Sequence, residues 1–353
     1  MSLYESLRPL LFALPAESAH GLGKRGMRVA QSLNPVRSLV RSQYQVRHDA
    51  LEVEAFDSTF PAPVGVAAGF DKNGEVSHCI ADLGFGFAEI GTVTPYPQSG
   101  NPRPRLFRLP DDDGMINRLA FNSQGAERVR ERLETEGLPE IPIGVNIGKM
   151  NTSGPEEAIE DYRRVFDRLY PHPDYFVVNV SCPNTPDAFD EDDPDHLDAI
   201  FTTLAAANDE DKPILVKVGP DSTREALAEL VDMLSGHDVA GYVATNTTTD
   251  HSDLTSQHRD ERGGVSGAPL EEKATETVRT LHAHTDEPIV GVGGVRDAET
   301  AYRKIRAGAT LVQLYTGFIY GGPGTARRIN RGLVDLLADD GFTSVSDAVG
   351  VDA

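Results

Sequence analysis

Short apolar runs alternate with amphipathic stretches along the chain from residue 61 onward. Eight runs read as strands: Pro63–Ala67, Gly86–Gly91, Pro142–Ile147, Tyr175–Val180, Pro213–Val218, Gly241–Thr245, Pro288–Val292 and Thr310–Tyr315. The stretches between and after them predict helices at Glu127–Glu136, Glu156–Leu169, Arg224–Leu234, Ala298–Ala307 and Ala326–Leu337. Strands that are apolar throughout are typical of a parallel sheet buried on both faces. Eight strand–helix units predict an α/β fold, a (β/α)8 TIM barrel, with a doubly wound open sheet as the alternative.

The first 50 residues differ from the rest and predict an N-terminal helical extension. A leucine stripe predicts one helix before Pro15, and a second amphipathic helix follows it. This segment has seven basic and three acidic residues, a net charge of +4, whereas the remaining chain carries −26. An apolar stripe beside basic residues is typical of helices that lie on a membrane surface. The alternative is a pair of helices that caps the barrel. No run is long enough to span a membrane.

Three divisions of the chain are therefore expected: the helical extension at residues 1–50, the barrel at 51–338 and an acidic, frayed tail at 339–353. The long connections after the second, fourth and sixth apolar runs are expected to form the rim of the active site.

The composition narrows the class of protein. The net charge of −22 disfavours nucleic-acid binding over the general surface. Only seven of the 33 basic residues are lysine, and an acidic, lysine-poor surface suggests a halophilic source. Two cysteines and no signal peptide pattern fit a cytosolic protein without a disulfide framework.

Polar and glycine residues follow the strand-like runs, where a barrel carries its chemistry. They are Ala67 to Lys72, Gly91 and Thr92, Asn146 to Gly148, Asn179 to Asn184, Lys217, Thr245 to Thr247, Gly293 and Gly294, and Tyr315 to Gly317. A single Asn after a strand is usually a turn residue. Together these residues predict a pocket for a planar ligand rich in N–H and C=O groups.

The last two strand ends add glycines, and a helix is expected soon after each. Backbone N–H groups and helix ends at this place bind phosphate in many barrels. The alternative is that the glycines only turn tight loops. No GxGxxG dinucleotide pattern is present, and no metal site is predicted, because the histidines are scattered and the acidic runs fit solvated loops.

A set of ordered strings resembles the dihydroorotate dehydrogenase family. They are AAGFDKNGE, GFAEIGTVTPYPQSGNPRPRLFRL, INRLAFNSQG, GVNIGK, NVSCPNTPD, VKVGPD, ATNTT, GGVSGAPL, GVGGV and LVQLYTGFIYGGP, and they cover most of residues 63–323. The extension is similar to that of the class 2, quinone-dependent enzymes. The resemblance implies a (β/α)8 barrel that oxidises dihydroorotate to orotate in pyrimidine biosynthesis, with FMN as hydride acceptor. It also implies a membrane quinone as partner and a peripheral place on the cytoplasmic side of the cell membrane.

The resemblance also implies roles for individual residues. FMN would contact Ala68, Gly69, Phe70, Asp71, Lys72, Thr92, Asn146, Asn179, Lys217, Thr245, Gly267, Gly294, Tyr315 and Thr316. The last three of these would hold its phosphate. The substrate would contact Lys72, Asn117, Arg118, Leu119, Ala120, Phe121, Asn179, Asn184, Asn246 and Thr247.

Cys182 stands where class 2 enzymes carry a serine as catalytic base, and class 1 enzymes use cysteine. A thiol ionises more readily than a hydroxyl, so Cys182 is expected to be the base that takes a carbon-bound proton. Cys79 is expected to be a core residue.

Other functions stay open at this point. A class 1 enzyme with a soluble acceptor is the nearest alternative. A barrel aldolase would use Lys217 as a Schiff base, and a binding protein for a phosphate ligand would need neither Lys217 nor Cys182.

Overall fold

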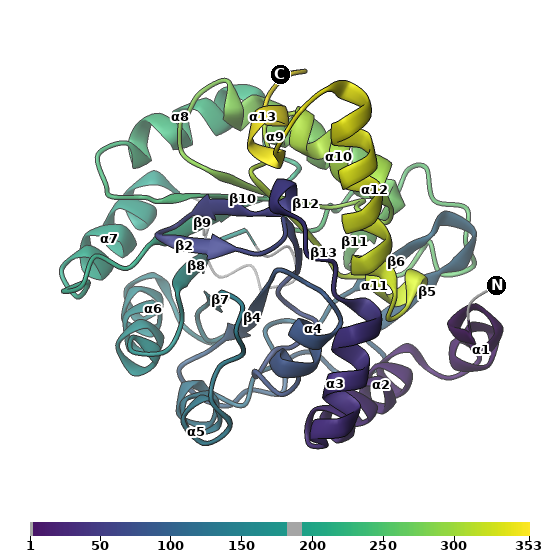
Figure 1. Cartoon of the computed structure of the whole chain (residues 1–353). Coiled ribbons are helices and arrows are strands. Elements are labelled where there is room, and N and C mark those ends of the chain that lie inside the picture. The colour runs from purple at the N-terminus through teal and green to yellow at the C-terminus, as the bar shows by residue number, and fades with distance from the viewer. Residues whose placement is uncertain (1–2, 182–192) are drawn as a thin grey trace.

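A computed structural model describes residues 3–181 and 193–353. Eight parallel strands form a closed barrel, which Figure 1 shows nearly end-on. They are β3 (Val64–Val66), β4 (Phe87–Val93), β7 (Ile143–Ile147), β8 (Tyr175–Asn179), β9 (Ile214–Val218), β10 (Gly241–Ala244), β12 (Ile289–Val292) and β13 (Leu311–Leu314). The last strand pairs with the first, with Val312 opposite Val64, so no edge is left open. The predicted barrel and its eight strands are confirmed.

The helices form an outer layer around the barrel. They are α4 (Ser77–Asp82), α5 (Ala126–Glu136), α6 (Pro155–Leu169), α7 (Pro194–Ala205), α8 (Arg224–Leu234), α9 (Glu271–His282), α10 (Ala298–Arg306), α11 (Thr316–Gly321) and α12 (Thr325–Asp340). The five predicted helices are all present. In α6 the buried residues Ala158, Tyr162, Val165 and Leu169 recur every three or four positions, which is the spacing of one helix face.

A hairpin of β1 (Val53–Ala55) and β2 (Ser58–Phe60) crosses one end of the barrel (Figure 1). The Phe60 ring lies 5.3 Å from the Phe87 ring inside the barrel, and the Phe56 ring lies 5.5 Å from that of Tyr175. The sequence pattern did not predict this hairpin, which supplies the aromatic plug at the end of the barrel away from the strand carboxyl termini.

A small antiparallel sheet contains β11 (Gly264–Gly267), β6 (Gly114–Asn117) and β5 (Leu106–Leu109) in that order. It unites the long connections that follow β4 and β10, two of the three connections expected to form the rim. The third, after β8, contains residues 182–192, which lie outside the described part of the chain.

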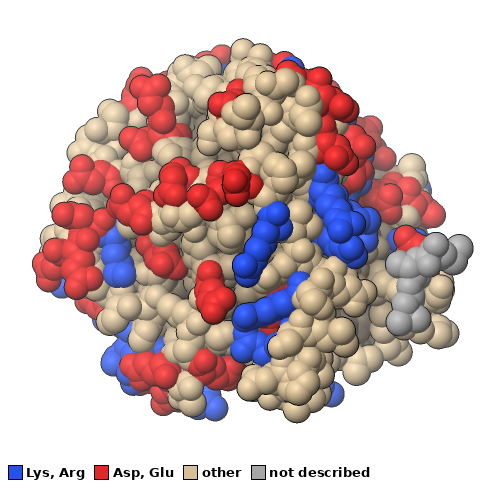
Figure 2. Space-filling view, in the orientation of Figure 1, with Lys and Arg blue, Asp and Glu red and all other residues tan. Residues whose placement is uncertain are grey.

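Three N-terminal helices lie against one side of the barrel, beside β5 and α4 (Figure 1). They are α1 (Leu3–Phe12), α2 (Ala16–Gln31) and α3 (Asn34–Tyr44). Large apolar side chains on these helices and in the turns between them are exposed: Leu7, Leu10, Leu14, Leu22, Val29, Leu33 and Leu39. Acidic side chains are numerous on the surface of the barrel helices, whereas the surface over α2 and α3 shows mainly basic and uncharged side chains (Figure 2). Among the described residues, none of the helices has the length and apolar character needed to cross a bilayer.

The C-terminal segment is packed, so the expectation of a frayed tail is wrong. Helix α13 (Val345–Ala348) buries both of its end residues in the core. The backbone N–H of Gly350 donates to Ile305 O (3.2 Å), and Arg306 forms an ion pair with Asp352 (2.6 Å). The prediction rested on the acidic composition of the tail and overlooked Val345 and Ala348, whose burial, together with these contacts, fixes the tail against α10.

Candidate active site

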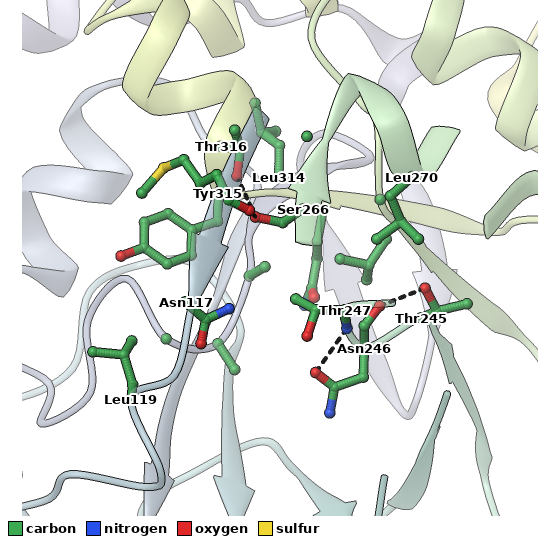
Figure 3. A pocket seen from close by; sticks show the side chains of 18 of the residues that line it. Asn117, Leu119, Thr245, Asn246, Thr247, Ser266, Leu270, Leu314, Tyr315 and Thr316 are labelled. Atoms are coloured by element: carbon green, nitrogen blue, oxygen red, sulfur yellow. Dashed lines mark hydrogen bonds between the residues drawn. The ribbon is translucent and has the colours of Figure 1, made fainter. Parts of the chain in front are cut away.

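A pocket lies where the carboxyl ends of the barrel strands meet the small sheet (Figure 3). Seventeen of the predicted site residues line it: Ala68, Gly69, Lys72, Thr92, Asn117, Leu119, Ala120, Phe121, Asn179, Lys217, Thr245, Asn246, Thr247, Gly267, Gly294, Tyr315 and Thr316. They come from seven strand ends and from both long connections that form the small sheet. The structure therefore brings together residues that are up to 248 positions apart in the chain.

Two predicted residues of the loop after β3 point elsewhere. Phe70 packs its ring against those of Tyr315 (5.6 Å) and Phe318 (5.0 Å), on the side of the N-terminal helices. Asp71 is buried, and its carboxylate accepts the backbone N–H groups of Glu75 (2.9 Å) and Val76 (2.8 Å). Both residues thus shape the loop that carries Gly69 and Lys72 into the pocket, rather than line the pocket themselves.

Arg118 also points away from the pocket. Its guanidinium pairs with Glu261 (2.8 Å) and donates to Pro104 O (3.0 Å), and it lies 4.5 Å from the centre of the Phe107 ring. These contacts join the two long connections outside the pocket. Cys182 and Asn184, predicted as base and substrate ligand, lie outside the described residues.

Asn146 does not line the pocket but holds two residues that do. Its Oδ1 accepts from Thr92 Oγ1 (2.5 Å) and from Asn179 Nδ2 (3.1 Å), and its own Nδ2 donates to Glu89 Oε1 (2.8 Å). All four side chains are buried. A buried and satisfied network of this kind fixes the rotamers of the side chains that face the ligand.

Glu89 is the anion at the centre of this interior. It also accepts from Gln313 Nε2 (2.9 Å), and its Oε1 lies 3.8 Å from Lys217 Nζ. Glu89 and Gln313 were not predicted as site residues, although Glu89 is the one charged residue of β4 and Gln313 the one polar residue of β13. That pattern is a usable signal, since a buried carboxylate or amide requires partners.

The residues after β10 form one side of the pocket (Figure 3). Asn246 Nδ2 donates to Asn179 Oδ1 (3.2 Å), and Asn246 Oδ1 accepts the backbone N–H of Thr247 (2.9 Å). Thr245 Oγ1 donates to Asn246 O (2.7 Å). The amide of Asn246 is therefore held in one orientation before any ligand binds.

The opposite side is the wall segment, residues 117–121. Ala120 and Phe121 have φ angles of 53° and 49°, in the left-handed region that non-glycine residues rarely adopt. Asn151 Nδ2 donates to Ala120 O (3.0 Å) and Gln98 Nε2 donates to Phe121 O (2.9 Å). Two strained residues in succession persist where surrounding contacts impose the conformation, and such strain concentrates at ligand sites.

The end of the pocket predicted to hold phosphate is formed by Gly293, Gly294 and Thr316. The two glycines have φ angles of 114° and 76°. Thr316 Oγ1 lies 2.9 Å from Ser266 Oγ, so two hydroxyl groups meet there (Figure 3). The N-terminus of α10 is already capped by Asp297, which accepts the N–H of Thr300 (2.9 Å). This N–H group of α10 is therefore already bonded, and the phosphate site itself stays a prediction.

The donors and acceptors of the pocket fit FMN. Gln313 Oε1 and Thr247 Oγ1 are buried, line the pocket and have no hydrogen-bond partner among the described residues. A buried acceptor without a partner is costly unless a ligand supplies a donor. A Cβ at Gly69 would meet only the Tyr315 ring, at 3.5 Å, so the backbone there is open to a planar group. Among the described residues no cluster of His, Cys, Asp and Glu has the makeup of a metal site.

A second, apolar cavity lies between α1, α2 and the barrel. Leu106, Met115 and Tyr315 line both cavities, so a single layer of side chains separates them. His20 of α2 lines the apolar cavity, and its ring lies 5.2 Å from that of Phe70. Burial, together with the Lys24 ammonium, lowers the pKa of His20 to about 4, so its imidazole is neutral at physiological pH.

A family model for dihydroorotate dehydrogenase matches residues 50–337. The chain belongs to the dihydroorotate dehydrogenase family. Curated relatives named "Dihydroorotate dehydrogenase (quinone)" include one from Halobacterium salinarum, 50% identical over 351 residues, which covers 99% of this chain and 100% of the relative. Another, from Natronomonas pharaonis, is 50% identical over 353 residues and covers both chains completely.

Solved structures of this family have the same fold. The dihydroorotate dehydrogenase of Eimeria tenella in complex with ferulenol has a TM-score of 0.81 and 35% identity, over 90% of this chain and 94% of that one. The resemblance inferred from the motifs is thus confirmed, including its assignment to the quinone-dependent class.

Cys79, the other cysteine, is buried in α4, as expected for a core residue. Burial and the nearby Asp82 raise the pKa of its thiol to about 12, so it is not a nucleophile. Site residues that were not predicted, besides Glu89 and Gln313, are the pocket-lining residues Leu106, Met115, Ser266, Leu270, Val292, Val295 and Leu314. All of these except Ser266 are apolar, and an apolar residue carries no local signal of a site.

Proposed function

We propose that this protein oxidises dihydroorotate to orotate with FMN and passes the electrons to a membrane quinone, in pyrimidine biosynthesis. The observation that carries the proposal is the pair of adjacent cavities. One is polar and rich in amides, the other is apolar, and Leu106, Met115 and Tyr315 alone line both. Such a pair suits a reaction in which a polar substrate is oxidised on one side and a hydrophobic acceptor is reduced on the other.

FMN would occupy the polar pocket against Gly69, Thr92, Lys217, Gly267 and Thr245, with its phosphate near Gly294 and Thr316. Bound there, it supplies a two-electron acceptor for hydride. Lys217 contributes a buried positive charge at the pocket wall, held by the Glu89 carboxylate 3.8 Å away. A fixed cation favours negative charge that develops beside it.

The pyrimidine would lie between the wall segment and the residues after β10. Asn117, Asn179 and Asn246 present amide groups to it, and Thr247 Oγ1 is the acceptor still without a partner. Asn179 and Asn246 are fixed by the network described above, so they would orient the substrate without rearrangement. Cys182 would take the proton from the substrate carbon as the hydride leaves.

The quinone would enter through the apolar cavity between α1 and α2. The exposed leucines on these helices and the excess of basic residues in the first 50 support a peripheral position on the cytoplasmic side of the membrane. The acidic, lysine-poor surface elsewhere supports a high-salt environment, in which the Debye length is about 3 Å at 1 M salt and self-repulsion is screened.

An absorption spectrum tests the proposal. The purified protein should contain FMN, and dihydroorotate added without oxygen should bleach the flavin absorbance. Addition of a long-chain quinone should then restore the absorbance. A folded preparation that neither contains nor takes up FMN would refute the proposal.

A second candidate is the same oxidation with a soluble acceptor, as in class 1 enzymes. The cysteine at position 182 favours it. Rapid reoxidation by a water-soluble oxidant, and not by quinone, would identify this alternative.

A further inference from the structure

The wall segment is supported by a second segment, residues 98–105, which precedes β5. Asn101 Nδ2 donates to Arg118 O (3.0 Å). A Cβ at Gly100 would lie 2.1 Å from Leu119 O, so the two backbones are in direct contact and only glycine fits. The conformation of the wall segment therefore depends on this supporting segment.

Arg105 holds the supporting segment in place. Its Nη1 donates to Ser99 O and to Asn101 O (3.1 Å), and its Nε donates to Glu17 Oε1 (3.0 Å). Its own carbonyl accepts the backbone N–H of Arg118 (2.9 Å), so Arg105 contacts both segments. The Arg105 side chain is only 6% exposed. A buried guanidinium with all three nitrogens in use has one favourable position.

Glu17 connects this arrangement to the N-terminal helices. It lies in the first turn of α2, between Ala16 and His20, which both line the apolar cavity. The contact between Glu17 and Arg105 spans 88 positions in the chain. One ion pair thus joins the helix beside the apolar cavity to the wall of the polar pocket.

We propose that Arg105 is a positioning residue for dihydroorotate, and that its ion pair with Glu17 lets α2 set the geometry of the wall segment. The inference rests on the proposed function. Arg105 does not line the pocket, so its effect passes through Asn101 and the strained residues Ala120 and Phe121. The wall contacts the bound substrate both before and during the reaction, so its loosening weakens substrate binding more than it slows the chemical step.

The central experiment compares Arg105→Gln with the full-length wild type, both loaded with FMN. Stopped-flow reduction of the flavin by dihydroorotate gives the limiting rate and the substrate concentration at half-saturation. We expect that concentration to rise by about tenfold or more, with a change in limiting rate of less than about threefold. Orotate affinity, measured from the perturbation of the flavin spectrum, should fall by the same factor.

Arg103→Gln is the matched control. Arg103 contacts the same Glu17 oxygen (3.2 Å) but is 74% exposed, and it makes no bond to the wall segment in the described structure. Its removal should leave both constants at wild-type values. Glu17→Ala should weaken substrate binding in the same direction as Arg105→Gln, and the double variant should be no worse than Arg105→Gln alone. Arg105→Lys keeps the charge but not the fork of donors and should restore binding only in part.

If Arg105→Gln does not retain FMN, Glu17→Ala decides the matter, because Glu17 lies outside the polar pocket. Unchanged dihydroorotate half-saturation in either FMN-loaded variant, or an equal effect of Arg103→Gln, would overturn the inference. Failure of the proposed function would look different, since the wild type itself would then not be reduced by dihydroorotate.

Discussion

Glu89 Oε1 and Lys217 Nζ lie 3.8 Å apart inside the barrel, although their strands, β4 and β9, are separated by β7 and β8. Both side chains are buried, and Glu89 also accepts from Asn146 (2.8 Å) and Gln313 (2.9 Å). A carboxylate with three donors around it is the arrangement that makes a buried charge tolerable. The interior of the barrel is therefore held by a polar network, and the pocket is built on top of it.

Glu89→Gln tests this network. The new amide can accept from one neighbour but presents its own N–H groups to the others and leaves Lys217 without a counter-charge. We expect the free energy of unfolding to fall by about 3 kcal/mol. Denaturant unfolding in molar KCl measures it. Glu54→Gln is the control. Exposed Glu54 accepts from Thr59 Oγ1 (2.6 Å) and from no other group in the described part of the chain, so its replacement should change the free energy of unfolding by less than ~0.5 kcal/mol. Equal stabilities of the two variants would contradict the importance of the buried network.

Cys182→Ala tests the assignment of the base. Flavin reduction by dihydroorotate should slow by ~10²–10⁴-fold while orotate still binds, because the group that takes the proton is missing. Cys182→Ser should keep some activity with its pH dependence moved upward, since serine is the weaker acid. Cys79→Ala is the control and should reduce flavin at the wild-type rate. Near-normal reduction in Cys182→Ala would show that another group takes the proton.

Removal of residues 1–33 tests the division of labour between the two cavities. Dihydroorotate should still reduce the flavin, whereas quinone reduction should fall sharply and the protein should leave the membrane fraction. The deletion also removes two ion-pair partners. Arg105 loses its contact with Glu17, and Asp71 loses Lys24, whose Nζ lies 3.0 Å from its carboxylate. We therefore expect weaker dihydroorotate binding as well. Quinone reduction at the full-length rate would mean that the helices are only a structural cap.

A milder version of that experiment uses the full chain. Gly23 lines the apolar cavity, and a Cβ there would have no atom within 4 Å. Gly23→Phe should fill the cavity and block quinone reduction without slowing flavin reduction. Gly26→Phe, one turn further along the same helix and equally open, is the matched control and should leave both half-reactions unchanged.

Lys304 supplies a prediction about pH. Its ammonium is buried between α10 and α9, where it donates to Thr275 Oγ1 (2.9 Å), and burial lowers its pKa to about 7. The unfolded chain keeps this proton up to about pH 10.4. The unfolded state therefore binds more protons between pH 7 and 10, and the contribution of Lys304 to stability rises with pH across that window.

Lys304→Met should remove this dependence and stabilise the protein at pH 7 by ~2–4 kcal/mol, after the loss of the bond to Thr275. Unfolding free energies measured at pH 7 and pH 9.5 check both parts. Lys273→Met is the control. Lys273 is 37% exposed and pairs with Asp221 (2.9 Å), so its loss should cost up to ~1 kcal/mol instead. A loss of stability in Lys304→Met at pH 7 would show that the ammonium is better accommodated than its burial implies.

The sequence by itself determined the barrel, because each strand is a local run whose apolar character repeats in eight places. The same locality placed Thr92, Asn179 and Thr245 at strand ends, and parallel closure then brings strand ends together. The identity of the family also came from local strings. These features can be predicted without knowledge of any contact between residues far apart in the chain.

Tertiary structure decided what local pattern does not encode. The strands β6 and β11 pair Asn117 with Gly264, and their stability comes from that distant partner rather than from their own short sequences. Adjacent residues of one motif also have different roles. Lys72 lines the pocket, whereas the Asp71 carboxylate accepts a backbone N–H of its own loop. The ion pair of Glu17 with Arg105 belongs to the same class, since only folding brings α2 against the supporting segment. Folding creates these contacts between residues that are far apart in the chain. The sequence shows each residue of such a pair but does not show that the two meet.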